Sequence, residues 1–98
     1  MHAAALRIEV HIPDSSSLKD KRKVVRPFVE GLRRVASLSV SEVDHHDTWQ
    51  RAAFGVAIAA PEAAELERLI ARVRRYVDDQ IEMSVVDVKL TYMEDLDG

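Results

Sequence analysis

The chain has no cysteine among its 98 residues. This absence excludes disulfides, thiolate catalysis and cysteine-ligated zinc. No apolar run approaches the ~18–20 residues that a membrane-crossing helix needs. The first ten residues also lack the basic start, apolar block and small-residue cleavage site of a signal peptide. We therefore expect a cytoplasmic protein without a membrane partner.

Asparagine is absent as well, and Gln50 and Gln80 are the only glutamines. Such depletion beside 32% charged residues is typical of thermophile proteins. With 47% hydrophobic residues, the composition is too apolar for a disordered chain. The length predicts a single domain over residues 1–98 with a modest core, and we find no linker, repeat or low-complexity segment.

Hydrophobic periodicity predicts the first four elements. Residues 6–12 alternate between apolar and polar side chains as a half-buried strand does. Residues 18–36 keep one apolar arc at helical spacing across Pro27, which predicts a single kinked helix capped by Ser16 or Ser17. Residues 38–47 and 50–60 read as two strands of a hairpin, and the opposite parity of Val40 and Val43 indicates a bulge.

The remaining residues complete the order β-α-β-β-α-β. Pro61 at a first helical position predicts a second helix, and residues 86–92 alternate as a last strand. Residues 94–98 are expected to form a frayed acidic tail. This order predicts an α+β, ferredoxin-like sandwich, with a four-stranded antiparallel sheet and two helices on one face. Right-handed crossovers place the first and third strands at its centre.

The uncovered sheet face carries no aromatic side chain on the two central strands. The first of these strands presents Arg7, Glu9 and His11, and the other presents Arg51, Ala53, Gly55, Ala57 and Ala59. RNA-recognition domains of this topology stack bases on aromatics at such positions, so that binding mode is disfavoured. The small residues Gly55, Ala57 and Ala59 instead allow another backbone close, which predicts a homodimer through the sheet face or its edges. Alternatively, these residues merely tolerate exposure or are covered by a flanking side chain.

Charge is distributed unevenly along the chain, whose net charge is −3. Residues 1–38 carry eight basic and four acidic side chains, whereas residues 62–98 carry five basic and ten acidic. On the first helix the cations fall within about 60° on either side of Lys19, with Glu30 the one acid inside their arc. They are Lys19, Arg22, Lys23, Arg26, Arg33 and Arg34. Lys21 falls toward the apolar side, where its stem can snorkel.

A stripe of one sign meets phosphates with strongly salt-dependent affinity. We therefore expect RNA or another polyanion as the partner. An acidic protein, including the tail of a second copy, is the first alternative. An ordinary solvated helix face is the second.

Glu42, Asp44 and His46 lie at i, i+2 and i+4 of a predicted strand. Such a trio can ligate a divalent metal or supply acid–base chemistry. No partnered nucleophile, H-E-x-x-H motif or phosphate-cradling glycine loop supports either interpretation. We expect a non-enzymatic protein without metal, cofactor or identifiable small-molecule substrate, and keep a metal or hydrolytic site at residues 44–46 as an alternative. Trp49 is expected to pack against its own chain rather than to anchor a partner.

Two motifs resemble the YlxP-like family of small bacterial proteins, a domain of unknown function. They are S-L-K-D-K-R at residues 17–22 and E-V-D-H-H-D-T-W-Q-R-A at residues 42–52. The resemblance continues through F-G-V-A-I-A and V-V-D-V-K-L, while Pro27 stands where a non-proline is more usual.

The resemblance implies a ferredoxin-like α/β fold and no known catalytic residues. It also implies a connection to RNA or the ribosome, because genes of the family tend to lie beside genes for transcription termination, translation initiation and ribosome maturation. The phosphate contacts would then be Lys19, Arg22, Lys23 and Arg26, with Arg51 and residues 44–46 secondary.

Overall fold

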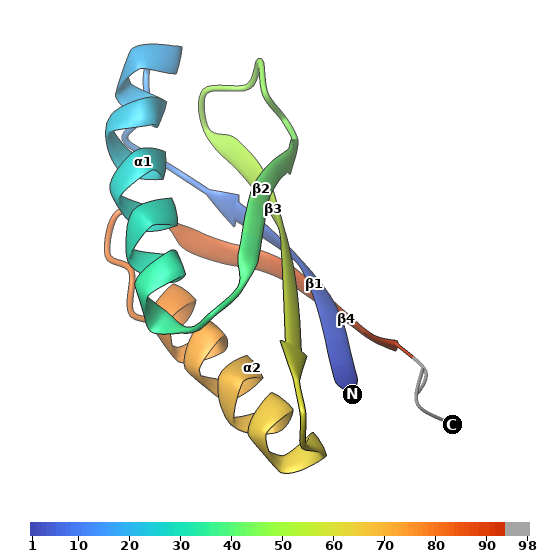
Figure 1. Cartoon of the computed structure of the whole chain (residues 1–98). Helices are drawn as coiled ribbons and strands as arrows, with labels where there is room; N and C mark the ends of the chain where they lie inside the picture. Colours follow the sequence, from blue (N-terminus) through green and yellow to red (C-terminus); the bar gives the residue numbers. More distant parts are fainter. Residues whose placement is uncertain (94–98) are drawn as a thin grey trace.

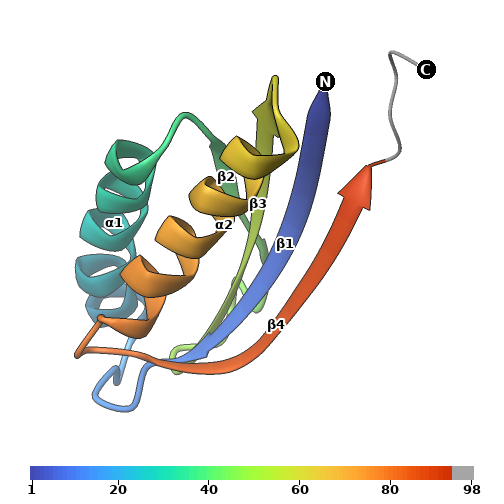
Figure 2. The ribbon, with the colours of Figure 1, turned by 90° about the horizontal axis from the view of Figure 1, so that it is seen from below.

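The fold is a four-stranded antiparallel sheet with two helices on one face. A computed structural model describes residues 1–93. Its elements are β1 (His2–His11), α1 (Leu18–Val35), β2 (Ser39–Asp44), β3 (Arg51–Ala60), α2 (Ala63–Asp78) and β4 (Ser84–Met93). The strand order is β2-β3-β1-β4, and α1 and α2 lie side by side over the sheet (Figures 1 and 2). The predicted ferredoxin-like architecture is confirmed, while the predicted frayed tail lies outside the described residues.

The core lies between the helices and the inward face of the two central strands. β1 and β3 pair over ten residues, which sets Leu6 opposite Val56 and Ile8 opposite Phe54. Alternation sends these side chains toward the helices, where Leu32 of α1 packs against the same cluster. All five side chains are at most 2% exposed. The inward residues of both strands follow the predicted alternation, whereas Ala53, on the open side of β3 opposite Glu9, is buried.

The first helix begins where a serine cap satisfies its free amide groups. Ser17 is the N-cap, and its Oγ accepts a hydrogen bond of 3.0 Å from the Asp20 N–H. The Asp20 carboxylate in turn accepts from the backbone N–H and the hydroxyl of Ser16, chiefly the latter, and this lowers the pKa of Asp20. The helix continues through Pro27 to Val35, as one apolar arc predicted. None of the described helices is long and apolar enough to span a membrane.

The start of α2 and the register of β4 differ from the sequence prediction. α2 begins after its cap Glu62, whose backbone is extended, so Pro61 precedes the helix and does not occupy its first position. β4 contains a register shift against β1 between Glu9 and Val10, which inserts Val86 as an extra residue. Val85 therefore pairs with Val10, while Val86 is 50% exposed. Simple alternation cannot anticipate this shift, because one inserted residue reverses the phase of the strand.

The two helices meet at a close contact between Gly31 and Tyr76. The Tyr76 hydroxyl donates a 2.7 Å hydrogen bond to the Phe28 carbonyl oxygen, and its ring lies 5.4 Å from the Phe28 ring between centroids. A Cβ atom at Gly31 would stand 2.3 Å from the Tyr76 hydroxyl oxygen. Glycine is therefore required here by space, although it weakens the helix.

Gly31→Ala should destabilise the protein by about 1–3 kcal/mol, because the added methyl group displaces a packed and hydrogen-bonded ring. Helix propensity alone gives the opposite sign, since alanine is favoured over glycine by about 1 kcal/mol. Urea unfolding of the wild type and the variant measures the difference. In a Tyr76→Phe background the penalty should shrink. A Gly31→Ala variant more stable than wild type would contradict this account.

Candidate functional site

One charge from each of the motifs at residues 17–22 and 42–52 meets the other inside the protein at one end of the sheet. Lys21 projects from α1 toward β2, and its side chain is only 4% exposed. Its Nζ lies 2.8 Å from Glu42 Oε2 and donates a 2.7 Å hydrogen bond to the His45 carbonyl oxygen. The sequence predicted a snorkelling stem at this position. The structure instead buries the whole side chain and supplies a carboxylate and a carbonyl for its charge.

Glu9 is the centre of a second group of charges on the open face of the sheet. Its carboxylate accepts hydrogen bonds from Arg51 of β3 and from Arg7, the latter at 3.1 Å. The Nε2 atom of His45 lies 3.2 Å from the same carboxylate. The hydrogen bonds from Arg51, then those from His45 and Arg7, lower the pKa of Glu9 from 4.5 to about 2. Glu9 therefore stays ionised far below neutral pH.

His45 connects these two groups of charges. Its backbone φ is 63°, a left-handed conformation that is uncommon outside glycine. Its N–H donates to Asp44 Oδ1 at 2.7 Å, and its carbonyl oxygen accepts from the Thr48 N–H as well as from Lys21. Asp44 also pairs with Arg7 at 3.1 Å. The bond from the His45 N–H is the main reason that the pKa of Asp44 is lowered, and the turn is thus fixed on several sides.

Gln50 ties the hairpin to the loop before α1. Its side-chain amide donates to the carbonyl oxygens of Pro13 and Ser15 at 3.3 and 3.1 Å. The backbone carbonyl oxygen of Gln50 accepts from the Ile12 N–H. Trp49, by contrast, is 51% exposed. The expectation that it packs against its own chain is wrong. The residues that follow it, Gln50 and Arg51, hold the chain to the loop and the sheet, and the indole remains half outside.

The predicted trio of Glu42, Asp44 and His46 does not converge. A register shift between Glu42 and Asp44 leaves Val43 as an extra residue, as the parity of the valines indicated. Glu42 consequently points to Lys21 of α1, whereas Asp44 points to Arg7 on the opposite face. Among residues 1–93, no three His, Cys, Asp or Glu side chains are arranged to hold a metal ion. The interpretation of this trio as a metal site is therefore wrong.

The cations predicted on the first helix all face away from the sheet. Lys19, Arg22, Lys23, Arg26, Arg33 and Arg34 are exposed. None of them lies within 4 Å of a carboxylate in the described part of the chain. Arg51 is separated from them, because it lies on the open face and is paired with Glu9.

The sequence prediction did not extend the basic surface to the cations of α2. Arg68, Arg72 and Arg75 are exposed at i, i+4 and i+7, while Leu66, Ile70, Val73 and Val77 of the same helix are buried. This spacing puts the arginines on the side opposite the core. We call these three residues and the six of α1 the basic helix layer, since the two helices lie side by side (Figure 2). The spacing of these arginines can be recognised in the sequence, but the position of α2 beside α1 cannot.

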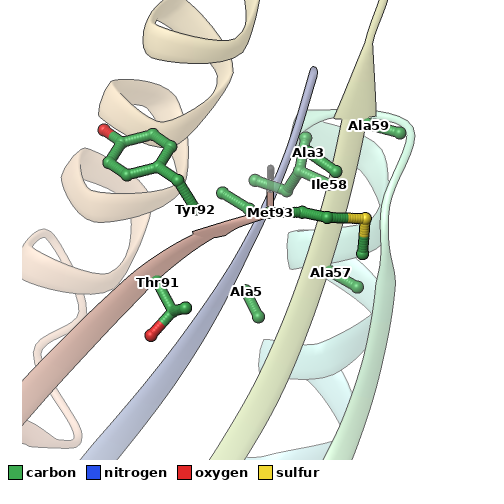
Figure 3. A pocket seen from close by; sticks show the side chains of 9 residues that line it. Ala3, Ala5, Ala57, Ile58, Ala59, Thr91, Tyr92 and Met93 are labelled. Atoms are coloured by element: carbon green, nitrogen blue, oxygen red, sulfur yellow. The ribbon is translucent and has the colours of Figure 1, made fainter. Parts of the chain in front are cut away.

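The open face carries an apolar hollow at the other end of the sheet. Its volume is about 370 Å³, and the Met93 side chain lies across it (Figure 3). Residues lining it include Ala3, Ala5, Ala57, Ala59 and Thr91. Ala57 and Ala59 of the predicted contact row are exposed. Gly55 is half-buried, and a Cβ atom there would stand 2.9 Å from the side chain of Val43.

Comparison with known proteins assigns the chain to a family. Residues 3–90 match the family described as "Protein of unknown function (DUF503)". The protein belongs to this family. It is 34% identical over 70 residues to the uncharacterized protein YlxP of Bacillus subtilis (strain 168), which covers 71% of this chain and 76% of that protein. The resemblance inferred from the two motifs is confirmed, and the DUF503 family is one of unknown function.

Solved structures similar to this DUF503 protein support the fold alone. The de novo designed protein Foldit4 has a TM-score of 0.57 at 14% identity, covering 91% of this chain and 96% of the design. A second designed protein, LFR1 1 with a ferredoxin fold, has a TM-score of 0.51 at 8% identity, covering 95% and 84%.

Glu9→Gln tests the ionic group on the open face. Because the pKa of Glu9 is about 2 in the fold against 4.5 ordinarily, its charge stabilises the folded state above pH 4.5. This contribution is lost as the pH falls from 4.5 toward 2. Thermal midpoints measured between about pH 7 and 2 should fall more steeply for wild type than for the variant. Glu30→Gln, at an exposed position on α1, should follow the wild-type profile, and parallel profiles for Glu9→Gln and wild type would contradict the assignment.

Proposed function

We propose that this protein is a non-enzymatic factor that binds double-helical RNA through the basic helix layer. The main support is that exposed cations cover two adjacent helices. None of these cations has a carboxylate of the described chain within 4 Å. Such cations gain phosphate contacts without first breaking an internal ion pair. Binding that releases counterions from phosphates is then favourable even for a protein of net charge −3.

The chemistry of the helix layer favours duplex over single-stranded RNA. Proteins that hold single strands stack the bases on exposed aromatic side chains. In residues 1–93 the exposed aromatics are Trp49 and Tyr92, and neither lies on a helix. Double-helical RNA is recognised mostly by its shape and by contacts to phosphates and 2′-hydroxyls, which rows of arginine and lysine on two packed helices can provide.

The open sheet face is the less favourable surface for RNA. On it, Arg7 and Arg51 are paired with Glu9, and Arg7 also with Asp44. A phosphate would have to compete with these carboxylates for each guanidinium group. The ribosomal setting of related genes, implied by the family resemblance, makes ribosomal RNA helices the first duplexes to test.

Removing pairs of cations should weaken binding uniformly across duplex sequences. Arg22→Gln with Arg26→Gln on α1, or Arg68→Gln with Arg72→Gln on α2, each deletes two possible phosphate contacts. For each pair, the slope of log affinity against log salt should fall by up to about 1.8, at about 0.9 per contact. Fluorescence anisotropy with a ribosomal RNA hairpin over about 50–300 mM salt measures both quantities.

The matched control places the same charge change on the other face. Ser39→Glu with Ser41→Glu lowers the net charge by two at exposed positions of β2, and it should leave the salt slope unchanged. Glu30→Gln should tighten binding, because it removes the one acid inside the arc of α1. Absence of binding at about 50 mM salt would reject the proposal, as would equal losses in the control and the helix variants.

Protein docking at the alanine-lined hollow is the second candidate function. An apolar depression of about 370 Å³ on an otherwise charged sheet face favours it. Ala57→Arg should abolish a complex formed there and leave RNA affinity unchanged, whereas Ser41→Arg on the same face should preserve the complex. Co-purification with both tagged variants and with wild type distinguishes these outcomes, and equal recovery of a partner by all three would exclude the hollow.

A further inference from the structure

Two charges on β4 face like charges on the neighbouring strand. Asp87 lies directly opposite Glu9 of β1, and Lys89 lies directly opposite Arg7. Like charges at directly opposed positions destabilise an antiparallel pair. Both residues of β4 are exposed, and neither forms an ion pair with any residue that the structure describes. Glu9 and Arg7, by contrast, are paired with each other and with other residues of the open face.

β4 is also an edge strand whose outer side has no partner in the described chain. It is ten residues long, contains no proline, and borders only β1 in the sheet (Figure 2). Three large apolar side chains on it are half-exposed, namely Val86, Tyr92 and Met93 at 50, 50 and 55%. The other edge, β2, has only six residues, and each edge strand carries one bulge, at Val43 in β2 and at Val86 in β4. A long edge strand with exposed apolar side chains invites pairing with another strand.

We propose that β4 pairs antiparallel with β4 of a second copy, about a two-fold axis through Val88. In this register Asp87 lies opposite Lys89 of the second copy, and Lys89 lies opposite its Asp87. Both charges, unpartnered in the described chain, gain an opposite charge on the same sheet face.

The positions of Asp87 and Lys89 along β4 determine both the partner strand, β4 of a second copy, and its register. An axis through Asp87 would oppose two carboxylates, and an axis through Lys89 would oppose two ammonium groups. An axis between two residues would oppose side chains of different faces, because the side-chain period of a strand is two. The axis through Val88 is thus the one that pairs Asp87 with Lys89, and the D-V-K segment is complementary to a reversed copy of itself.

The resulting dimer is an eight-stranded sheet with both helix layers on the same side. Strand pairing of this length buries a modest area, so association should be weak and concentration-dependent. Sedimentation equilibrium at about 5–500 µM protein and low salt should therefore show a monomer–dimer equilibrium. A wild-type protein that stays monomeric over this range would overturn the proposal.

Lys89→Asp should raise the dissociation constant about 10- to 100-fold, because it opposes two carboxylates twice across the axis. Within one chain the new carboxylate at position 89 lies opposite Arg7, so the fold is not weakened and the thermal midpoint at low protein concentration should not fall. The fold-stability measurement therefore separates dissociation from unfolding. Lys23→Asp makes the same charge change on α1 and should leave dimerisation unchanged.

The double variant Asp87→Lys with Lys89→Asp should restore dimerisation to within a few-fold of wild type, because the pairs across the axis are exchanged rather than lost. Failure of this exchange to rescue Lys89→Asp would overturn the register and the proposal with it. RNA affinity plays no part in these measurements, so they stand apart from the proposed function.

Discussion

The buried ammonium group of Lys21 determines the shape of the β2–β3 end of the molecule. A charge that is 4% exposed must be compensated inside the protein, and Glu42 and the His45 carbonyl oxygen do this from one segment. To turn both groups toward α1, the chain inserts the extra residue Val43 and gives His45 a left-handed backbone. The same geometry places Asp44 beside Arg7, and the imidazole of His45 beside Glu9, on the open face of the sheet. The two sequence motifs are therefore two halves of one structural unit.

The spacing of apolar residues predicted the regular strands and helices, and it failed where a bulge interrupts the alternation of a strand. The inward faces of β1 and β3 and the continuity of α1 through Pro27 follow from spacing alone. The trio Glu42, Asp44 and His46 failed because alternation was extended across a bulge. The ionic groups could not be predicted at all, since Glu9 and Arg51 are 42 positions apart and only the register of β1 and β3 unites them. Trp49 illustrates the same difficulty, because its exposure depends on contacts that its neighbours make.

Charge is distributed differently on the two faces of the molecule. On the open face, cations and carboxylates alternate over paired strands and neutralise one another around Glu9. On the helix layer, exposed cations project from both helices, with Glu30 as the acid within the arc of α1, and each α-helix separates its cations from the core by half a turn of the helical wheel. The two faces thus differ in kind. Around Glu9 the sheet face is ordered by internal ion pairs, whereas the cations of the helix layer have no carboxylate of the described chain within 4 Å.

Edge pairing through β4 would join two such helix layers without covering either of them. A two-fold axis perpendicular to the sheet reverses the strand and keeps the faces, so both layers lie on the side opposite the open face. Linking two binding surfaces raises the effective concentration of the second once the first is engaged, with no new contact to the ligand. The arrangement therefore suits an extended helix of RNA better than a short one, because only a duplex long enough to reach both layers gains from it. The charges of Asp87 and Lys89, costly beside β1 in a single chain, would then be the groups that set this spacing.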